Sequence, residues 1–475
     1  MGYLNNAVCI SATVLSLTAC SHSVLAGHAL SARFDPQRVS GLAVSDGPSG
    51  PRSDAPGATR TVLGTDGGQN DKLAALGVTD IEAFWKVHYP KAFGQPFNPV
   101  KKLVSADGDD PSAPTECGSP ENNAAYCRLD DSISWDRSER SGLLPIAQKY
   151  FGPIAVVGVL AHEYGHAVQS HAGLPKKTAT IVKEQQADCY AGTYMRWVAE
   201  GNSPRFVLST ADGINHLLAG LLAIRDPIDP EADPDDSDAH GTGLDRISAF
   251  QVGFELGPKP CAAITKTEIA KRRGDLPRSL FAANGQNSDV ALDKDTLATL
   301  APQLQKIFQP TKAPTFTTGS ASCDGKRSAQ AASYCPSSNT VAVDLPALQQ
   351  LGSPASESEH VLLQGDNTAI SLLVSRYVLA LQQQRGLPLD NPHAAMRTAC
   401  LTGVAQRKMA QPTSPQSTDG LTLGAGDLDE AIAGLLTNGG VASDVNGAVL
   451  PAGFTRVSAF RAGLLGDVDD CFRRF

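Results

Sequence analysis

The sequence predicts a mainly α-helical chain of the α+β class, built as two copies of one disulfide-stapled domain. Two observations lead to this prediction. Each half contains four cysteines at matching intervals, and each half has a long apolar stretch that ends in Gly-Leu-Pro. At 475 residues the chain is also too long for one ordinary domain, and a hydrophobic content of 41% is enough for two cores.

The cysteine pattern is the clearest sign of the repeat. Successive cysteines are 10, 62 and 72 residues apart in the first half and 12, 65 and 71 apart in the second. The neighbouring residues match as well: AAYC with ASYC, CYAG with CLTG, and RISAF with RVSAF. A repeat of this length, with matched neighbours, predicts a duplicated domain. The eight cysteines are Cys117, Cys127, Cys189, Cys261, Cys323, Cys335, Cys400 and Cys471.

Composition sets the expected boundaries. Residues 21–70 are rich in Gly, Pro, Ser and Asp and lack apolar periodicity, which predicts a flexible linker. The two copies are expected at 71–262 and 288–475, with a second linker at 263–287. Pairing within copies leaves three arrangements in each, among which sequence alone does not choose. We favour Cys117–Cys127, Cys189–Cys261, Cys323–Cys335 and Cys400–Cys471, each stabilising the fold by about 2.5–4.5 kcal/mol.

The N-terminus is typical of an exported protein. Residues 7–19 form a short apolar segment that ends in small residues, as in a signal peptide. The segment ends in Leu17-Thr18-Ala19-Cys20, which resembles the bacterial lipobox. This resemblance predicts a lipoprotein signal peptide over 1–20 and lipidation of Cys20. The protein would then be anchored on the outer side of the cell membrane. An ordinary signal peptide and secretion are the alternative, because no Lys or Arg precedes the apolar segment.

Charge excludes one class of partner and leaves one acidic stretch to explain. The net charge is −9 and no basic stripe is present, so nucleic acid is not expected as a partner. Residues 226–238 contain seven acids but lack the spacing of an EF-hand calcium loop. We expect this stretch to be a solvated loop.

The first copy contains the motif HEYGH at 162–166. It lies in an apolar segment in which Pro153 suits the start of a helix and Gly173 its end. His162 and His166 are four residues apart, so they share one helix face and can bind one ion. Zinc favours such ligands, and Glu163 beside them can act as general base on the attacking water. We therefore expect one Zn²⁺ per chain.

The next predicted helix, TIVKEQQADCYAGTYMRWVAEG, offers a third ligand. Glu184 and Asp188 are four residues apart and face the same way. Glu184 has the reach to bind zinc, and Asp188 can accept a hydrogen bond from a ligand histidine. A solvated helix face is the alternative for two acids at this spacing. The second copy lacks both these acids and the HExxH residues, which suggests that they form one site.

The second copy keeps the frame of the first without its metal-binding residues. Ser375, Arg376 and Leu379 occupy the positions that match the three HExxH residues. The matching Gly-Leu-Pro turn and the cysteines remain. We expect this copy to bind no metal, to contact the first copy and to serve as an inactive structural or recruiting partner.

The motifs HEYGHAVQ, EQQADCYAG and HGTGLDRISAF resemble those of the bacterial neutral zinc metallopeptidase family. The resemblance spans most of the first copy and is strongest over residues 117–261. It implies a zincin-like helical domain that hydrolyses a peptide or protein substrate. His240 lies in the family-like stretch and is expected to assist the oxyanion or the substrate, although an exposed loop histidine is the alternative. The duplication and the lipobox depart from the family pattern.

These features lead to one main prediction and one alternative. The chain is expected to be an exported, lipid-anchored zinc metallopeptidase with Glu163 as general base. The alternative is an exported binding or scaffold protein in which zinc is only structural. Glu163 favours the enzyme, because a structural zinc site has no use for a carboxylate beside an open coordination position.

Overall fold

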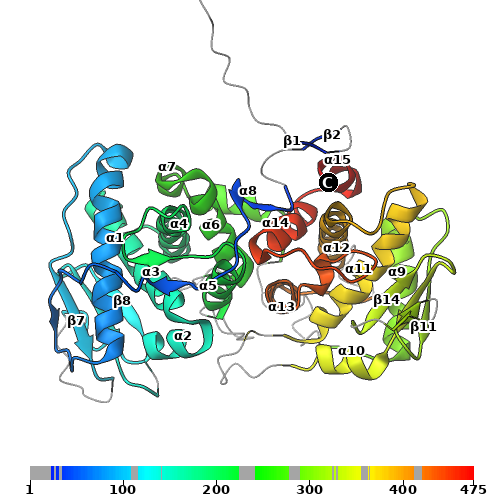
Figure 1. The fold of residues 1–475 in the computed structure, drawn as a ribbon, viewed down its shortest axis with the longest axis horizontal. Coiled ribbons are helices and arrows are strands. Elements are labelled where there is room, and N and C mark those ends of the chain that lie inside the picture. The colour runs from blue at the N-terminus through cyan, green and yellow to red at the C-terminus, as the bar shows by residue number, and fades with distance from the viewer. Residues whose placement is uncertain are drawn as a thin grey trace, which may run out of the picture.

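The computed structural model describes residues 35–108, 116–140, 142–223, 241–277, 289–323, 330–354, 362, 364–410 and 420–475, and the strands at 23–25, 28–30 and 326–327. The predicted signal peptide, Cys20 and His240 lie outside these residues. The described chain is mostly helical with small sheets, as predicted for a mainly α protein (Figure 1). None of the described helices is both long and apolar enough to span a membrane.

In the first half, a four-stranded sheet lies beside a group of helices. Its strand order is β6-β7-β9-β8, with β7 parallel to β9 and β8 antiparallel to β9. The strands are β6 (Val62–Leu63), β7 (Lys102–Ala106), β8 (Ala124–Cys127) and β9 (Ser132–Asp136). The helices are α1 (Gln69–Phe93), α2 (Leu143–Phe151), α3 (Pro153–His171), α4 (Thr180–Ala199), α5 (Asp212–Ala223), α6 (Gly243–Leu256), α7 (Pro258–Ala262) and α8 (Lys266–Arg273).

The second half has the same order of main elements. Its sheet, β11-β15-β14, pairs β11 parallel to β15 and β14 antiparallel to β15, as β7, β9 and β8 do. The strands are β11 (Thr315–Thr318), β14 (Ala332–Cys335) and β15 (Thr340–Val343), with a small pair β12 (Ser322–Cys323) and β13 (Lys326–Arg327). The helices are α9 (Lys294–Phe308), α10 (Leu345–Leu351), α11 (Asp366–Gln384), α12 (Pro392–Ala410), α13 (Ala425–Thr437), α14 (Gly453–Leu464) and α15 (Val468–Arg474), with the short 3₁₀ helix η3 (Gly440–Ala442).

Helix α3 begins and ends where its sequence predicts. Gly152 has a φ of 80°, which a glycine adopts without strain, and Pro153 supplies the first helical residue. Two residues after the helix ends at His171, Gly173 has a φ of 86°. The helix is buried on nearly all sides, so its largely apolar sequence is consistent with its position.

The closest helix crossing in each half depends on glycines. A Cβ at Gly192 on α4 would collide with the carbonyl of Phe250, and one at Gly253 on α6 with the carbonyl of Cys189. In the second half, Gly403 and Gly463 have the same relation across α12 and α14. Gly192 and Gly403 end the repeated CYAG and CLTG motifs, and in each half the pair of glycines lets the two helices meet backbone to backbone.

Four disulfides have the predicted pairing. They join Cys117–Cys127, Cys189–Cys261, Cys323–Cys335 and Cys400–Cys471. The longer bridge in each half ties α4 to α7 and α12 to α15, beside the glycine crossing.

The prediction of a flexible linker over 21–70 is wrong for residues 35–68. Strand β5 (Gly50–Pro51) pairs with β10 (Phe206–Val207), and β6 joins the sheet beside β7. The Ser45 amide donates to Thr210 Oγ1 at 2.8 Å. This segment is held by backbone hydrogen bonds to distant partners, which apolar periodicity does not reveal.

The predicted linker at 263–287 is also partly packed. It contains α8, where Arg273 forms an ion pair with Asp245 and Arg272 donates to Gln185. Ile264, Ile269 and Leu276 are buried. Residues 278–288 lie outside the described part of the chain.

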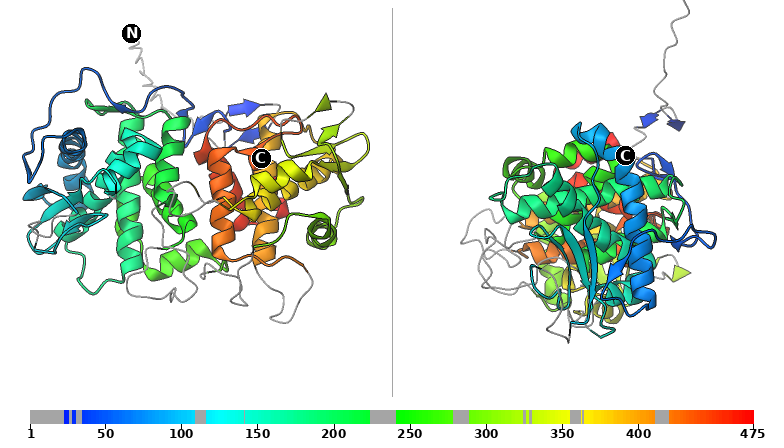
Figure 2. Two further views of the ribbon diagram at one scale, coloured as in Figure 1. Left: turned by 90° about the horizontal axis from the view of Figure 1, so that it is seen from below. Right: turned by 90° about the vertical axis from the view of Figure 1, so that its left-hand side faces the viewer.

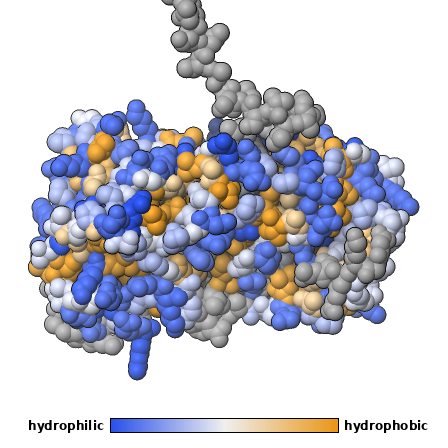
Figure 3. All heavy atoms as spheres, in the orientation of Figure 1, coloured by the Kyte–Doolittle hydropathy of each residue, from blue (hydrophilic) through white to orange (hydrophobic). Residues whose placement is uncertain are grey.

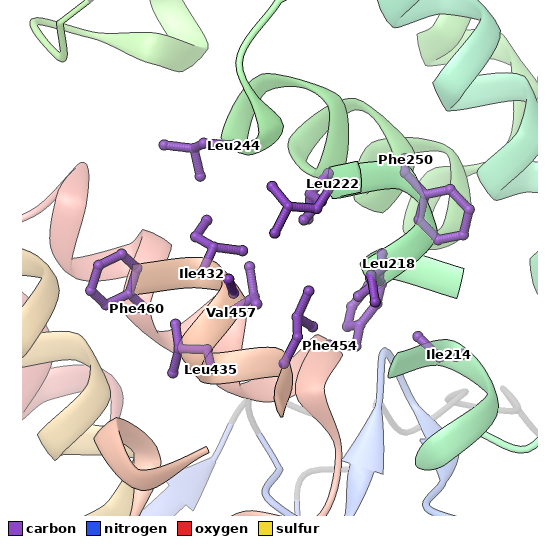
Figure 4. Packing of buried hydrophobic residues seen from close by; sticks show 14 of the residues in the cluster. Ile214, Leu218, Leu222, Leu244, Phe250, Ile432, Leu435, Phe454, Val457 and Phe460 are labelled. Atoms are coloured by element: carbon purple, nitrogen blue, oxygen red, sulfur yellow. The ribbon is translucent and has the colours of Figure 1, made fainter. Parts of the chain in front are cut away.

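The two halves share an apolar interface formed by α5 and α6 on one side and α13 and α14 on the other (Figures 1 and 2). Figure 4 shows apolar side chains of both halves close together there, among them Leu218 and Leu222 of the first half and Ile432, Phe454 and Val457 of the second. Polar contacts join the same helices. Asp429 accepts hydrogen bonds from the amides of Gly243 and Leu244 at the start of α6, at 2.9 and 3.0 Å.

The outer surface of the chain is more polar than this interface. Figure 3 shows hydrophilic side chains over much of one face, with smaller groups of hydrophobic side chains between them.

Candidate metal centre

Helices α3 and α4 bring together the three predicted metal ligands. One ligand atom each from His162, His166 and Glu184 lies within 4.8 Å of the others. His162 Nε2 is 3.2 Å from Glu184 Oε2, and His166 Nε2 is 3.4 Å from Glu184 Oε1. Gly165 permits this approach, because a Cβ there would lie 2.8 Å from the Cα of Ala187.

The other ring nitrogens are held by hydrogen bonds. His162 Nδ1 is 2.7 Å from Asp188 Oδ1, the partner predicted for it. His166 Nδ1 is 3.1 Å from Gln169 Oε1, and the Gln169 amide in turn donates to the carbonyl of Lys183. Because both acceptors are oxygens, each Nδ1 carries the proton. Each Nε2 faces Glu184, and once a metal displaces any proton there, its lone pair would be free to bind the metal.

Arg246, like Gln169, contacts the cluster in a way that the sequence did not predict. From α6, its Nε and Nη2 donate to the two carboxylate oxygens of Asp188 at 3.0 and 2.9 Å. Both side chains are fully or almost fully buried. The repeated motif RISAF contains this arginine, but the motif gives no sign of which helix it faces. The pair fixes the carboxylate that orients His162.

Glu163 lies beside the cluster but is not part of it. Its Oε2 accepts a hydrogen bond from the backbone amide of Tyr126 on β8 at 2.9 Å. Burial raises the pKa of Glu163, and the nearby His162 and His166 oppose that rise. A buried carboxylate held by one backbone amide, next to a metal-binding cluster, is suited to accept a proton.

The electrostatics of the cluster favour a positive charge, which either a proton or a metal ion can supply. Burial alone lowers the pKa of His162, but Asp188 and Glu184 outweigh it and raise that pKa to about 10. Burial would raise the pKa of Glu184, yet the two histidines hold it far below its usual value. Two imidazole nitrogens and one carboxylate, with hydrogen-bonded outer partners, match the ligands that zinc prefers. Binding zinc would displace the proton from His162.

An apolar cavity adjoins the cluster at His162. It lies among α2, α3, α5 and α6, and its lining includes Leu143, Phe151, Leu217 and Phe250. Apolar side chains therefore lie directly beside the candidate metal ligands.

In the second half, the matching position is filled by protein atoms. Arg376 is buried and donates to the carbonyls of Asp444 and Gly440, both at 3.1 Å, and to Ser443 Oγ at 2.9 Å. The Ser375 hydroxyl donates to the carbonyl of Leu372 on its own helix, and Leu379 is fully buried. The guanidinium group of Arg376 therefore has hydrogen-bond partners within the protein, in the space next to α11.

Comparisons with known proteins give little direct guidance. No protein-family model matches the chain, and no solved structure matches it. Uncharacterized proteins of Mycobacterium tuberculosis and Mycobacterium bovis are 27% identical to it over 219 residues. The match covers 42% of this chain and 71% of each mycobacterial protein.

Proposed function

We propose that the chain is a zinc metallopeptidase whose active site is the cluster in the first half. The observation that carries the proposal is the convergence of His162 Nε2, His166 Nε2 and Glu184, with Glu163 adjacent but outside the ligand set. A purely structural site would fill its fourth position with a protein ligand. The resemblance of the motifs to the bacterial neutral zinc metallopeptidases supports the same reaction.

The residues at the site have separate roles in the proposed hydrolysis of a peptide bond. His162, His166 and Glu184 would hold zinc, which when bound supplies a Lewis acid that polarises the scissile carbonyl. Glu163 accepts a proton from the attacking water and passes it to the leaving amine. Asp188, fixed by Arg246, keeps His162 in the required tautomer. The apolar cavity beside His162 would receive an apolar side chain of a peptide or protein substrate.

The second half is proposed to be a duplicated copy of the first that has lost the metal-binding and catalytic residues and kept the fold. Its matched sheet directions, glycine crossing and disulfides support a common origin. Its apolar contact with α5 and α6 supports a structural role toward the first half.

Export and lipid anchoring at Cys20 form part of the same proposal. They rest on the lipobox-like sequence and agree with four disulfides, which form in oxidising compartments. Fractionation of cells that express Cys20→Ala provides the test. Release of the variant from membranes, or its failure to be processed, is expected; unchanged membrane partitioning would exclude the anchor.

Metal analysis tests the zinc proposal directly. Purified wild-type protein should contain one zinc per chain, and His162→Ala or His166→Ala should contain none. His171→Ala is the matched control, since His171 ends the same helix but pairs with Asp131 outside the cluster. Two zinc ions per chain, or zinc retained by His162→Ala, would contradict the assignment.

A further inference from the structure

A second group of carboxylates lies in the other half, far in sequence from the zinc ligands. One oxygen each from Asp289, Asp366 and Glu430 lies within 4.8 Å of the others. Asp366 is the first residue of α11, Glu430 lies on α13, and Asp289 precedes α9. The group therefore joins three segments of the second half. The position in the first half that matches Asp366 is Pro153, which has no carboxylate.

The hydrogen bonds of this group leave one buried oxygen unused. Asp366 is only 6% exposed. Its Oδ2 accepts from the Val290 amide at 2.8 Å, but its Oδ1 has no hydrogen-bond partner among the described residues. A buried oxygen without a partner costs about 1–3 kcal/mol, and more if it is charged. A ligand that binds this oxygen would remove that cost.

The position of the Glu430 carboxylate depends on a backbone amide and a glycine at the start of α11. Its Oε2 accepts from the Asn367 amide at 3.0 Å, and its carboxylate lies against Gly365, where a Cβ would collide with it. The glycine thus leaves room for a carboxylate at the start of α11. This places Glu430 next to Asp366 although their charges repel.

Other acids lie close to the two buried carboxyls of this group. Asp427 and Asp289 both act on the carboxyls of Asp366 and Glu430 by charge repulsion. A cation bound among the three carboxylates would reduce the repulsion between them.

We propose that Asp289, Asp366 and Glu430 form a binding site for a divalent cation that prefers oxygen ligands, namely calcium. Carboxylate oxygens without nitrogen or sulfur are the ligands of hard cations, in contrast to the histidines of the zinc site. Bound calcium would satisfy the unused oxygen of Asp366 and tie α11, α13 and the segment before α9 together. The chain would then hold two metals of different classes, one in each half.

Calcium titration of the zinc-loaded full-length chain provides the test. After treatment with a calcium chelator, the wild type should bind calcium in calorimetry and melt at a higher temperature in millimolar calcium. Glu430→Gln, which keeps the size of the side chain, should weaken this binding about tenfold or more. Asp469→Asn is the matched control, because Asp469 is an exposed acid of the same half. It should bind calcium as the wild type does.

Further variants separate this site from the others. His162→Ala should lose zinc and still bind calcium, so failure of one metal site leaves the other testable. Calcium held by the acidic stretch 226–238 would survive Glu430→Gln. Gly365→Ala should weaken calcium binding by displacing Glu430, which gives a second test if Glu430→Gln does not fold. A wild-type melting temperature that calcium does not change, or equal calcium binding by wild type and Glu430→Gln, would overturn the proposal.

Discussion

Asp188 connects three helices through one buried carboxylate. It orients His162 on α3, lies on α4, and receives both hydrogen bonds from Arg246 on α6. Burial would raise the pKa of Asp188, but Arg246 and His162 outweigh burial and lower it. The carboxylate therefore stays charged and holds the Nδ1 proton of His162.

Asp188→Asn should weaken both the metal site and the fold. Loss of a carboxylate that orients a ligand histidine lowers metal affinity by about 10–100-fold. The buried Arg246 would also lose its counter-charge, at a cost of about 3–5 kcal/mol. Competition with a zinc chelator and denaturant unfolding measure the two effects. Glu200→Gln, which breaks an exposed pair with Arg196, should change neither by more than about 1 kcal/mol.

The raised pKa of Glu430 leads to a second prediction, which applies to the protein without calcium. Its pKa in the folded chain is raised to about 9, above the ordinary glutamate value, so the folded state binds more protons than the unfolded state between these two pH values. Stability should therefore fall as pH rises from about 5 to about 9. Glu430→Gln should reduce this fall and melt above the wild type at alkaline pH. Parallel melting curves for the two proteins at all pH values would contradict the prediction.

The sequence predicted the site residues whose spacing lies within one helix. His162 and His166 share a face of α3, and Glu184 and Asp188 share a face of α4, so helical periodicity was sufficient. Arg246 and Gln169 were not assigned roles, because their contacts depend on helix crossing and side-chain direction. His240, also predicted from the family-like stretch, lies outside the described residues.

At the scale of elements, the crossing of α4 and α6 positions both Glu184 and Arg246. The helices approach so closely that Gly192 and Gly253 each face a backbone carbonyl of the other helix. The Cys189–Cys261 bridge lies beside the same crossing. The candidate metal centre thus depends on a backbone contact that only glycine permits.

Gly192→Ala should therefore destabilise the first half and weaken zinc binding. A methyl group against a backbone carbonyl forces the helices apart, at a cost of about 1–3 kcal/mol or more. Gly403→Ala should destabilise the second half by a similar amount and leave zinc binding unchanged. Gly220→Ala is the control, since its added Cβ would have only ordinary contacts of 3.6 Å or more. Thermal melts and zinc titrations of the three variants give the comparison; a Gly192→Ala protein with wild-type zinc affinity would contradict this account.

The elements also show where sequence patterns were insufficient. Helices α3 and α4 were predictable from apolar runs, turn glycines and a proline. The structure of residues 35–68 was not predictable, because their two-residue strands each pair with one other strand, such as β10 or β7. Short strands of this kind have no periodicity to detect.

At the scale of the whole molecule, the two halves share apolar surface between α5–α6 and α13–α14 (Figure 4). Asp429 of the second half also binds the amides at the start of α6, the helix that carries Arg246. The second half therefore supports the candidate metal centre indirectly.

A chain ending at residue 277 should bind zinc through its own ligands but melt at a lower temperature than the full chain. Removal of the second half would expose apolar side chains such as Leu218 and Leu222, and burial of one such side chain contributes about 1.5–3 kcal/mol. Full-length Asp429→Ala should show a smaller decrease, because it removes only polar contacts with α6. Equal melting temperatures for truncated and full-length protein would mean that the halves are independent modules.

Digestion of a peptide library by wild type and Glu163→Gln, each with its zinc content measured, tests the central claim most directly. Glutamine keeps the size of Glu163 and its place beside Tyr126 but cannot accept the proton from water. We expect one zinc per chain in both proteins, with cleavage by the wild type and a loss of about 100-fold or more in the variant. A zinc-loaded wild type that cleaves no peptide, or a variant that cleaves as fast as the wild type, would contradict the peptidase assignment.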